Sequence, residues 1–153
     1  MGLASAGILM YRRGNNGLAV LLVHPGGPFW ARRDTGAWSI PKGEANLGEQ
    51  LRDVAVREFA EELGAPPQGL LQPLGEVRQA GGKRVTAFAV EGDFDTAALR
   101  SNTFEMEWPP RSGRIRTFPE VDRAEWFTLP LAAEKILAGQ RPLLDRLQQL
   151  IGE

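Results

Sequence analysis

The sequence contains no cysteine and only one histidine, His24. The missing cysteines exclude disulfides, thiolate metal sites and cysteine nucleophiles. A lone histidine without a partner defines neither a metal site nor a catalytic pair, and we interpret His24 as a structural or exposed residue that ends a strand.

The chain also lacks a long hydrophobic run and an excess of charge of either sign. The apolar run from Leu3 to Met10 is too short to span a bilayer, and Arg12 and Arg13 follow it, whereas a signal peptide places its charge first. The formal net charge of −1 favours neither nucleic acid nor an anionic membrane as a partner. We therefore expect a cytoplasmic protein whose 153 residues, 1–153, form a single domain.

Apolar runs and turn residues predict a series of strands and helices. Asn15, Asn16 and Gly17 join two runs and predict a β-hairpin, and Gly81-Gly82 predicts a second one. Breaks at Gly139 and Pro142 predict two short C-terminal helices. The expected strands cover residues 5–12, 18–24, 38–40, 74–79, 84–92 and 103–108, and residues 109–125 are expected to form a loop. Strands mixed with helices predict an α/β or α+β domain.

The stretch from Gly43 to Ala65 is expected to form one helix with an acidic face. Spacings of three and four residues place Glu58, Glu61 and Glu62 within an arc of roughly 100°. Neighbouring glutamates near a helix end usually form only a solvated surface. Three like charges on one face repel one another, however, and a divalent cation with oxygen ligands would relieve that repulsion.

The same stretch fits the pattern GX5EX7REUXEEXGU, in which U is a bulky apolar residue. The matching positions are Gly43, Glu49, Arg57, Glu58, Phe59, Glu61, Glu62 and Gly64, and only Ala65 is smaller than usual. The protein therefore resembles the Nudix hydrolases. The resemblance implies an α/β fold of the Nudix type, an α/β/α sandwich with a mixed β-sheet. It also implies hydrolysis of a pyrophosphate bond in a nucleoside diphosphate-linked substrate, with Mg²⁺ or Mn²⁺ as cofactor.

The resemblance also assigns roles to individual residues. Glu58, Glu61 and Glu62 would hold the metal, and Glu58 or Glu61 would also take a proton from water. Arg57 would orient the carboxylates by charge-assisted hydrogen bonds. The backbone carbonyl of Lys42 is a further expected metal ligand.

A late loop commonly adds another glutamate in this family. Glu120 occupies the comparable place, and Glu105 and Glu107 compete with it for the role. Glu49 is expected near the helix N-terminus, where the helix dipole favours a carboxylate.

Substrate contacts are expected from loops that carry basic and aromatic residues. Arg32, Arg33, Arg114 and Arg116 suit bidentate contact with phosphate, although solvated surface charge is an equal alternative for each. Trp30, with Phe29 and Trp108, offers a ring on which a base could stack.

Three functions fit these residues. The leading one is hydrolysis of a small nucleotide, either a dinucleoside polyphosphate or a nucleoside triphosphate. The second is a 5′-end RNA pyrophosphohydrolase, against which the near-neutral charge argues. The third is a non-catalytic nucleotide-binding regulatory module, which would have no reason to keep a self-repelling triplet of carboxylates. The sequence does not indicate the oligomeric state.

Overall fold

The computed structural model describes residues 4–152. Its main sheet contains six strands: β1 (Ser5–Gly14), β2 (Gly17–Pro25), β3 (Lys42–Glu44), β4 (Gln72–Arg78), β5 (Arg84–Glu91) and β8 (Val121–Thr128). The strands follow the order β4-β5-β1-β2-β8, and β3 pairs with β1. β1 and β5 are parallel and the other pairs are antiparallel. The sheet is therefore mixed.

Both predicted hairpins are confirmed. Gly14 pairs with Gly17 at the turn between β1 and β2, and Arg78 pairs with Arg84 beside the turn between β4 and β5. The second turn contains a short 3₁₀ segment, η1 (Ala80–Gly82).

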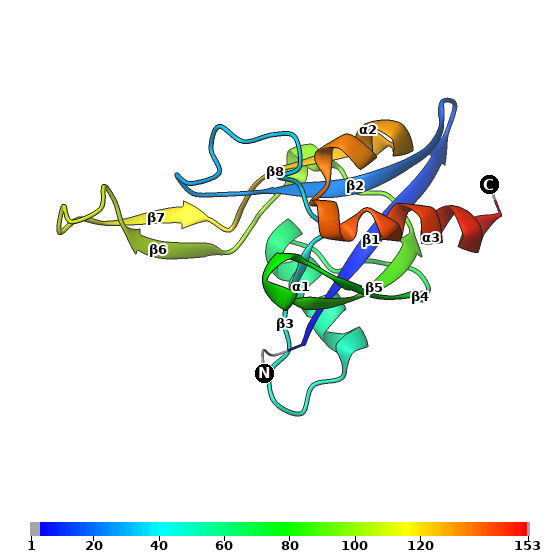
Figure 1. The fold of residues 1–153 in the computed structure, drawn as a ribbon, viewed down its shortest axis with the longest axis horizontal. Coiled ribbons are helices and arrows are strands. Elements are labelled where there is room, and N and C mark those ends of the chain that lie inside the picture. The colour runs from blue at the N-terminus through cyan, green and yellow to red at the C-terminus, as the bar shows by residue number, and fades with distance from the viewer. Residues whose placement is uncertain (1–3, 153) are drawn as a thin grey trace.

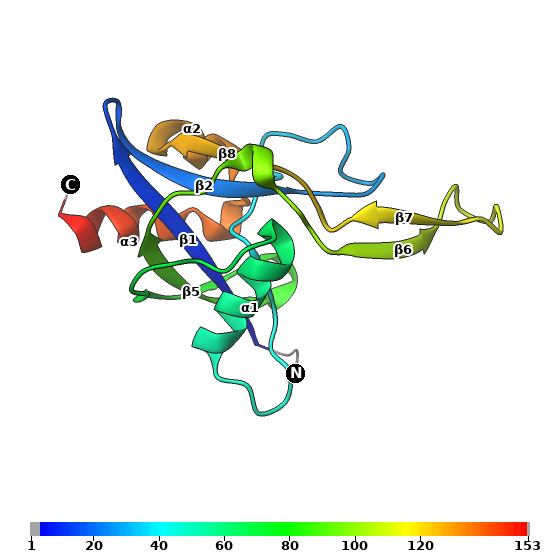
Figure 2. The same cartoon turned by 180° about the vertical axis from the view of Figure 1, so that it is seen from behind.

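Helices cover both faces of the sheet. In Figure 1, α2 (Leu129–Lys135) and α3 (Pro142–Ile151) lie in front of it, and Figure 2 shows α1 (Leu51–Leu63) on the opposite face. Two further 3₁₀ segments, η2 (Thr96–Ala98) and η3 (Ala138–Gln140), lie in the connections. The α/β/α sandwich is confirmed. Within residues 4–152, no helix is both long and apolar enough to cross a membrane.

The central strand β1 is buried on both of its faces. Its Ile8 and Met10 belong to the core beneath α1, and its Leu9 and Tyr11 belong to the core beneath α2 and α3. Successive side chains of a strand point to opposite faces, so a strand covered on both sides consists of a continuous apolar run. The sheet thus separates two hydrophobic cores.

Helix α1 is shorter than predicted. It begins at Leu51 and ends at Leu63, so Glu49 lies in the preceding loop and not on the helix. Gly64 ends the helix as predicted, in a left-handed conformation with φ of 95°, and its N–H donates to Ala60 O. The sequence between Gly43 and Leu51 instead supplies β3 and a loop.

Two other expectations were wrong. Trp38 and Ser39 make only isolated bridges, and the strand in this region is β3 at Lys42–Glu44. Residues 109–125 are not one loop, because they contain β7 (Ile115–Pro119) and the start of β8. β7 is exposed along most of its length, so it lacks the apolar alternation by which a strand is recognised.

Strands β6 (Thr103–Glu107) and β7 form a separate two-stranded sheet, which we call the arm. The arm projects from the body of the molecule (Figures 1 and 2). The loop after β2 braces it, because the Phe29 ring contacts the Trp108 ring at a centroid distance of 5.5 Å and Gly26 lies against Pro119.

Phe59 tests the packing of α1 on the sheet. It is 1% exposed among the core residues beneath α1, so Phe59→Ala should lower the free energy of unfolding by about 3–5 kcal/mol. Phe29→Ala is the matched control, because Phe29 is 64% exposed and its loss should cost less than about 1 kcal/mol. Urea unfolding followed by circular dichroism measures both values, and equal losses would contradict this packing.

Candidate active site

Arg57 of α1 joins carboxylates from two segments of the chain. Its Nη1 donates to Glu58 Oε2 at 2.7 Å and lies 3.4 Å from both oxygens of Glu61. Its Nε and Nη2 donate to the two oxygens of Glu49 at 3.1 and 2.9 Å. Such a bidentate pair fixes both geometry and charge. Arg57 therefore orients Glu58 and Glu61 and ties the loop before α1 to the helix.

The electrostatics agree with this contact pattern. The hydrogen bonds from Arg57, and then the N–H of Asn46 at 2.7 Å, hold the pKa of Glu49 below its usual value. The hydrogen bond to Glu49 is also the largest cause that raises the pKa of Arg57. The anionic form of Glu49 is thus favoured, and its two oxygens hold the Arg57 guanidinium in place.

Glu62 is the buried carboxylate of the group. Its exposure is 8%, and the backbone N–H of Lys42 donates to its Oε2 at 3.2 Å. The pKa of Glu62 is raised to about 8, mainly by burial and to a smaller extent by the charges of Glu58 and Glu120, while the hydrogen bond from Lys42 acts against this. The protonated form of Glu62 is therefore favoured at neutral pH in the absence of a counter-ion.

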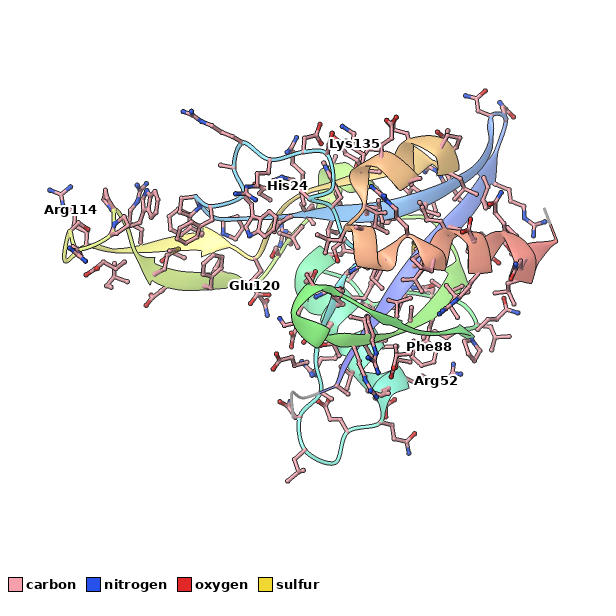
Figure 3. All side chains as sticks on the ribbon, viewed as in Figure 1. His24, Arg52, Phe88, Arg114, Glu120 and Lys135 are labelled. Carbon is pink, nitrogen blue, oxygen red and sulfur yellow. The ribbon has the colours of Figure 1, made fainter. Side chains whose placement is uncertain are left out.

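Glu58 and Glu120 belong to the same cluster of carboxylates as Glu61 and Glu62. Burial is the main cause that raises the pKa of Glu58, and Glu61 adds to it. Burial also raises the pKa of Glu120, again with a contribution from Glu61. Glu120 precedes β8, where the arm joins the body (Figure 3), so carboxylates from distant parts of the chain repel one another here.

Gly43 lets Glu58 lie close to β3. A Cβ atom at position 43 would collide with the carboxylate of Glu58. Only glycine therefore leaves room for this carboxylate to lie against the backbone beside Lys42.

A cavity of about 400 Å³ lies next to these carboxylates. Its charged and polar lining residues are Ser39, Lys42, Glu62, Gln79, Lys83 and Glu120. Its apolar lining includes Trp30, Val23, Ile40 and Leu137. The structure thus brings together four residues that were predicted for the site, namely Trp30, Lys42, Glu62 and Glu120.

The predicted arginines do not line this cavity. Arg32 and Arg33 are exposed, and the Arg33 guanidinium lies 5.6 Å from the centroid of the Trp30 ring. Arg114 lies toward the far end of the arm (Figure 3), and Arg116 lies over Phe118 on β7. Their contact with substrate remains a prediction.

The arm also carries the two competitors of Glu120. Glu105 and Glu107 lie on β6, and neither lines the cavity. Phe29 and Trp108 contact each other at the arm, so Trp30 is the aromatic residue that the cavity offers for stacking.

Gln79 and Lys83 are cavity residues that the sequence interpretation missed. They flank the turn between β4 and β5, whose glycines indicated only a hairpin. A lysine placed directly after turn glycines was the available signal, but the cavity that it faces is formed by segments far apart in the sequence.

His24 is a structural residue, which was one of the two alternatives expected from the sequence. It is fully buried, its Nδ1 lies 2.8 Å from Asp122 Oδ1 and its Nε2 lies 2.6 Å from Arg33 O. It thereby fixes the loop that carries Trp30 against β8.

The chemistry of the donor set fits a hard divalent cation. Within residues 4–152, no three carboxylate or imidazole groups are gathered closely enough to form a ready-made metal cage. Mg²⁺ does not require one, because it keeps several waters and typically uses one or two carboxylates together with substrate phosphates. Buried and mutually repelling carboxylates beside a cavity meet that need.

A family model described as NUDIX domain matches residues 1–147. The chain belongs to the Nudix family. As a Nudix protein it is a pyrophosphohydrolase. No curated protein matches the sequence significantly.

Solved structures share this Nudix fold along nearly the whole chain. An Ap4A hydrolase from C. elegans is 20% identical with a TM-score of 0.67, and the match covers 97% of this chain and 98% of that one. The NUDIX domain of Shewanella oneidensis NrtR, in complex with ADP ribose, is 17% identical with a TM-score of 0.67, covering 99% and 89%. A MutT protein from Methanosarcina mazei Go1 is 21% identical with a TM-score of 0.63, covering 99% and 96%.

Glu62 predicts how the stability of the metal-free protein depends on pH. Its pKa is raised from 4.5 to about 8 by folding, so its contribution to stability is complete below pH 4.5 and is lost as the pH rises through about 8. In EDTA, the free energy of unfolding should therefore fall between pH 5 and 9. Glu62→Gln should weaken this fall, whereas the exposed-site control Glu134→Gln should leave it unchanged.

Urea titrations at several pH values measure this dependence. An equal decline in the wild type and Glu62→Gln would show that Glu62 is not the group responsible.

Gly43 predicts how the position of Glu58 affects metal binding. Gly43→Ala would displace the Glu58 carboxylate and should weaken Mn²⁺ binding by about tenfold or more, as for other residues that hold a ligand in place. Gly14→Ala is the control, because the nearest atom to a Cβ there is 3.9 Å away. Calorimetric titration with Mn²⁺ measures both variants, and matching affinities would refute the role of Gly43.

Proposed function

We propose that this Nudix protein hydrolyses a phosphoanhydride bond in a small nucleotide, either a nucleoside triphosphate or a dinucleoside polyphosphate, with the help of Mg²⁺ or Mn²⁺. One observation carries the proposal. Glu62 on α1 and Glu120 before β8 line the same cavity as Lys42 and Trp30. Carboxylates for a metal, an amine for phosphate and a ring for a base are thus in one place.

Each group has a task in the reaction. When bound, the divalent ion neutralises phosphate charge and makes water more acidic. Glu58, Glu61, Glu62 and Glu120, with the carbonyl of Lys42, are the proposed ligands. Glu58 or Glu61 accepts the proton of the attacking water, the water oxygen bonds to phosphorus, and the bridging P–O bond breaks. The leaving phosphate takes the electron pair of that bond.

Arg57 acts through other residues. Because it binds Glu58 at 2.7 Å and both oxygens of Glu49, it keeps the catalytic carboxylate in one orientation. Trp30 is proposed to stack against the base. The guanidinium of Arg33 lies over the Trp30 ring and would hold that ring in position.

A substrate screen tests the proposal. Nucleoside triphosphates, dinucleoside polyphosphates, nucleotide sugars, ADP-ribose and 5′-triphosphate RNA are incubated with Mg²⁺, with Mn²⁺ or with EDTA. Released phosphate is measured after a coupling phosphatase that acts only on the products. We expect turnover of the triphosphates or dinucleoside polyphosphates, and none in EDTA.

Glu62→Gln is measured in the same screen. Loss of a residue that only supports a ligand costs about 10–100-fold in activity, so loss of a ligand itself should lower kcat by about 100-fold or more. Glu134→Gln is the control and should retain activity. No turnover of any compound, or full activity of Glu62→Gln, would overturn the proposal, and turnover of RNA alone would favour the 5′-end enzyme.

A further inference from the structure

Three lining residues of the cavity offer hydrogen-bond donors. Besides the carboxylates, it is lined by Lys42, by Gln79 and by Lys83. An ammonium group has three donors and no acceptor, so it is suited to anionic oxygens. These residues come from β3 and from the turn between β4 and β5, which lie in different parts of the sequence.

Lys42 and Lys83 line the same cavity from different segments of the chain, and each side chain ends in an ammonium group. Two cations that repel across one cavity are stabilised by an anion placed between them. The carboxylates of Glu58, Glu62 and Glu120 repel one another and favour a cation, and in the same way the two ammonium groups repel each other and favour an anion.

Gln79 is held with its donor end available. The buried Gln140 donates from Nε2 to Gln79 Oε1 at 2.7 Å and to Ser39 Oγ at 2.9 Å, and its Oε1 accepts from Ile40 N at 3.0 Å. Gln140 is 0% exposed and its amide is fully used. Because the oxygen of Gln79 is bound to Gln140, its NH₂ group is the end left for a ligand.

The turn itself fixes the spacing of these donors. Gln79 N donates to Lys83 O at 2.8 Å, and Gly82 N donates to Gln79 O at 3.1 Å. We call the segment from Gln79 to Lys83 the donor turn. Both of its polar side chains start from a backbone closed by hydrogen bonds, so the positions from which they reach into the cavity are fixed.

We propose that the donor turn, with Lys42, binds the phosphates beyond the two that flank the cleaved bond and so selects substrates with three or more phosphates in a chain. This inference rests on the proposed function and names the residues that would recognise the length of the phosphate chain. Two phosphates flanked by sugars, as in ADP-ribose, leave no further anion for Lys42 and Lys83. A tri- or polyphosphate chain supplies one.

The volume of the cavity agrees with this assignment. About 400 Å³ lies toward the lower end of the roughly 300–1,000 Å³ typical of ligand pockets. It therefore suits part of a nucleotide and its phosphates better than a whole dinucleotide, whose second nucleoside would extend outside.

Binding of inorganic tripolyphosphate and inorganic pyrophosphate tests the inference without any turnover. Both are titrated calorimetrically into the protein in the presence of Mg²⁺. We expect Lys83→Ala to weaken tripolyphosphate binding by roughly tenfold and pyrophosphate binding much less, because a hydrogen bond to a charged group is lost only with the longer chain.

Two further variants sharpen the result. Arg84→Ala removes the same charge from the neighbouring residue, whose Nε lies 3.8 Å from Glu76 Oε1, and should bind like the wild type. Gln79→Glu keeps an oxygen for Gln140 but replaces the donor by an anion, so it should weaken tripolyphosphate binding by at least as much as Lys83→Ala. Unchanged binding in Lys83→Ala, or an equal loss for both anions or in Arg84→Ala, would overturn the inference.

The outcome can be separated from that of the proposed function. Loss of tripolyphosphate selectivity in Lys83→Ala, combined with no turnover of any nucleotide, would leave the phosphate site in place and reject the hydrolase. Turnover of nucleotides with unchanged tripolyphosphate binding in Lys83→Ala would support the hydrolase and reject the phosphate site.

Discussion

The site depends on one guanidinium group that keeps like charges together. Glu58 and Glu61 follow Arg57 on α1, and their carboxylates would drive each other apart in a partly buried setting. Arg57 opposes this repulsion and is itself held by Glu49. The acidic helix can therefore pack Phe59 and Leu63 into the core while it presents its carboxylates beside the cavity. The same helix supports both the fold and the candidate site.

Much of the fold could be predicted because it follows local patterns. Turn glycines gave both hairpins, and Gly64 gave the end of α1. Glu49 was placed on the helix although Gly48 precedes it. Gly48 adopts a φ of 83°, which ends any helix there, and Arg57 holds Glu49 in the loop. The strand β7 was missed because it pairs only with β6 and buries little of its surface.

The candidate site also has one part that local sequence patterns predict and another that they do not. Its acidic part lies on one helix and could be predicted from spacing. The cavity is formed by Trp30, Lys42, Gln79, Lys83 and Glu120, which come together only when the sheet is assembled. No local pattern shows that a lysine after a turn faces a glutamate before another strand. The amide of Gln140, which orders Gln79 and Ser39 from the other side of the fold, is equally invisible in the sequence.

The position of β1 has a consequence for the order in which the chain acquires structure. β1 begins at Ser5, yet its parallel neighbour is β5, so that Ser5 pairs with Val85 and Tyr11 with Glu91. Contacts between residues so far apart close a large loop and make folding slow. The segment that forms α1 is synthesised before β5, and its apolar face has no complete sheet to cover until β5 emerges. Helix α1 is thus synthesised early, but the sheet on which it packs is complete only later.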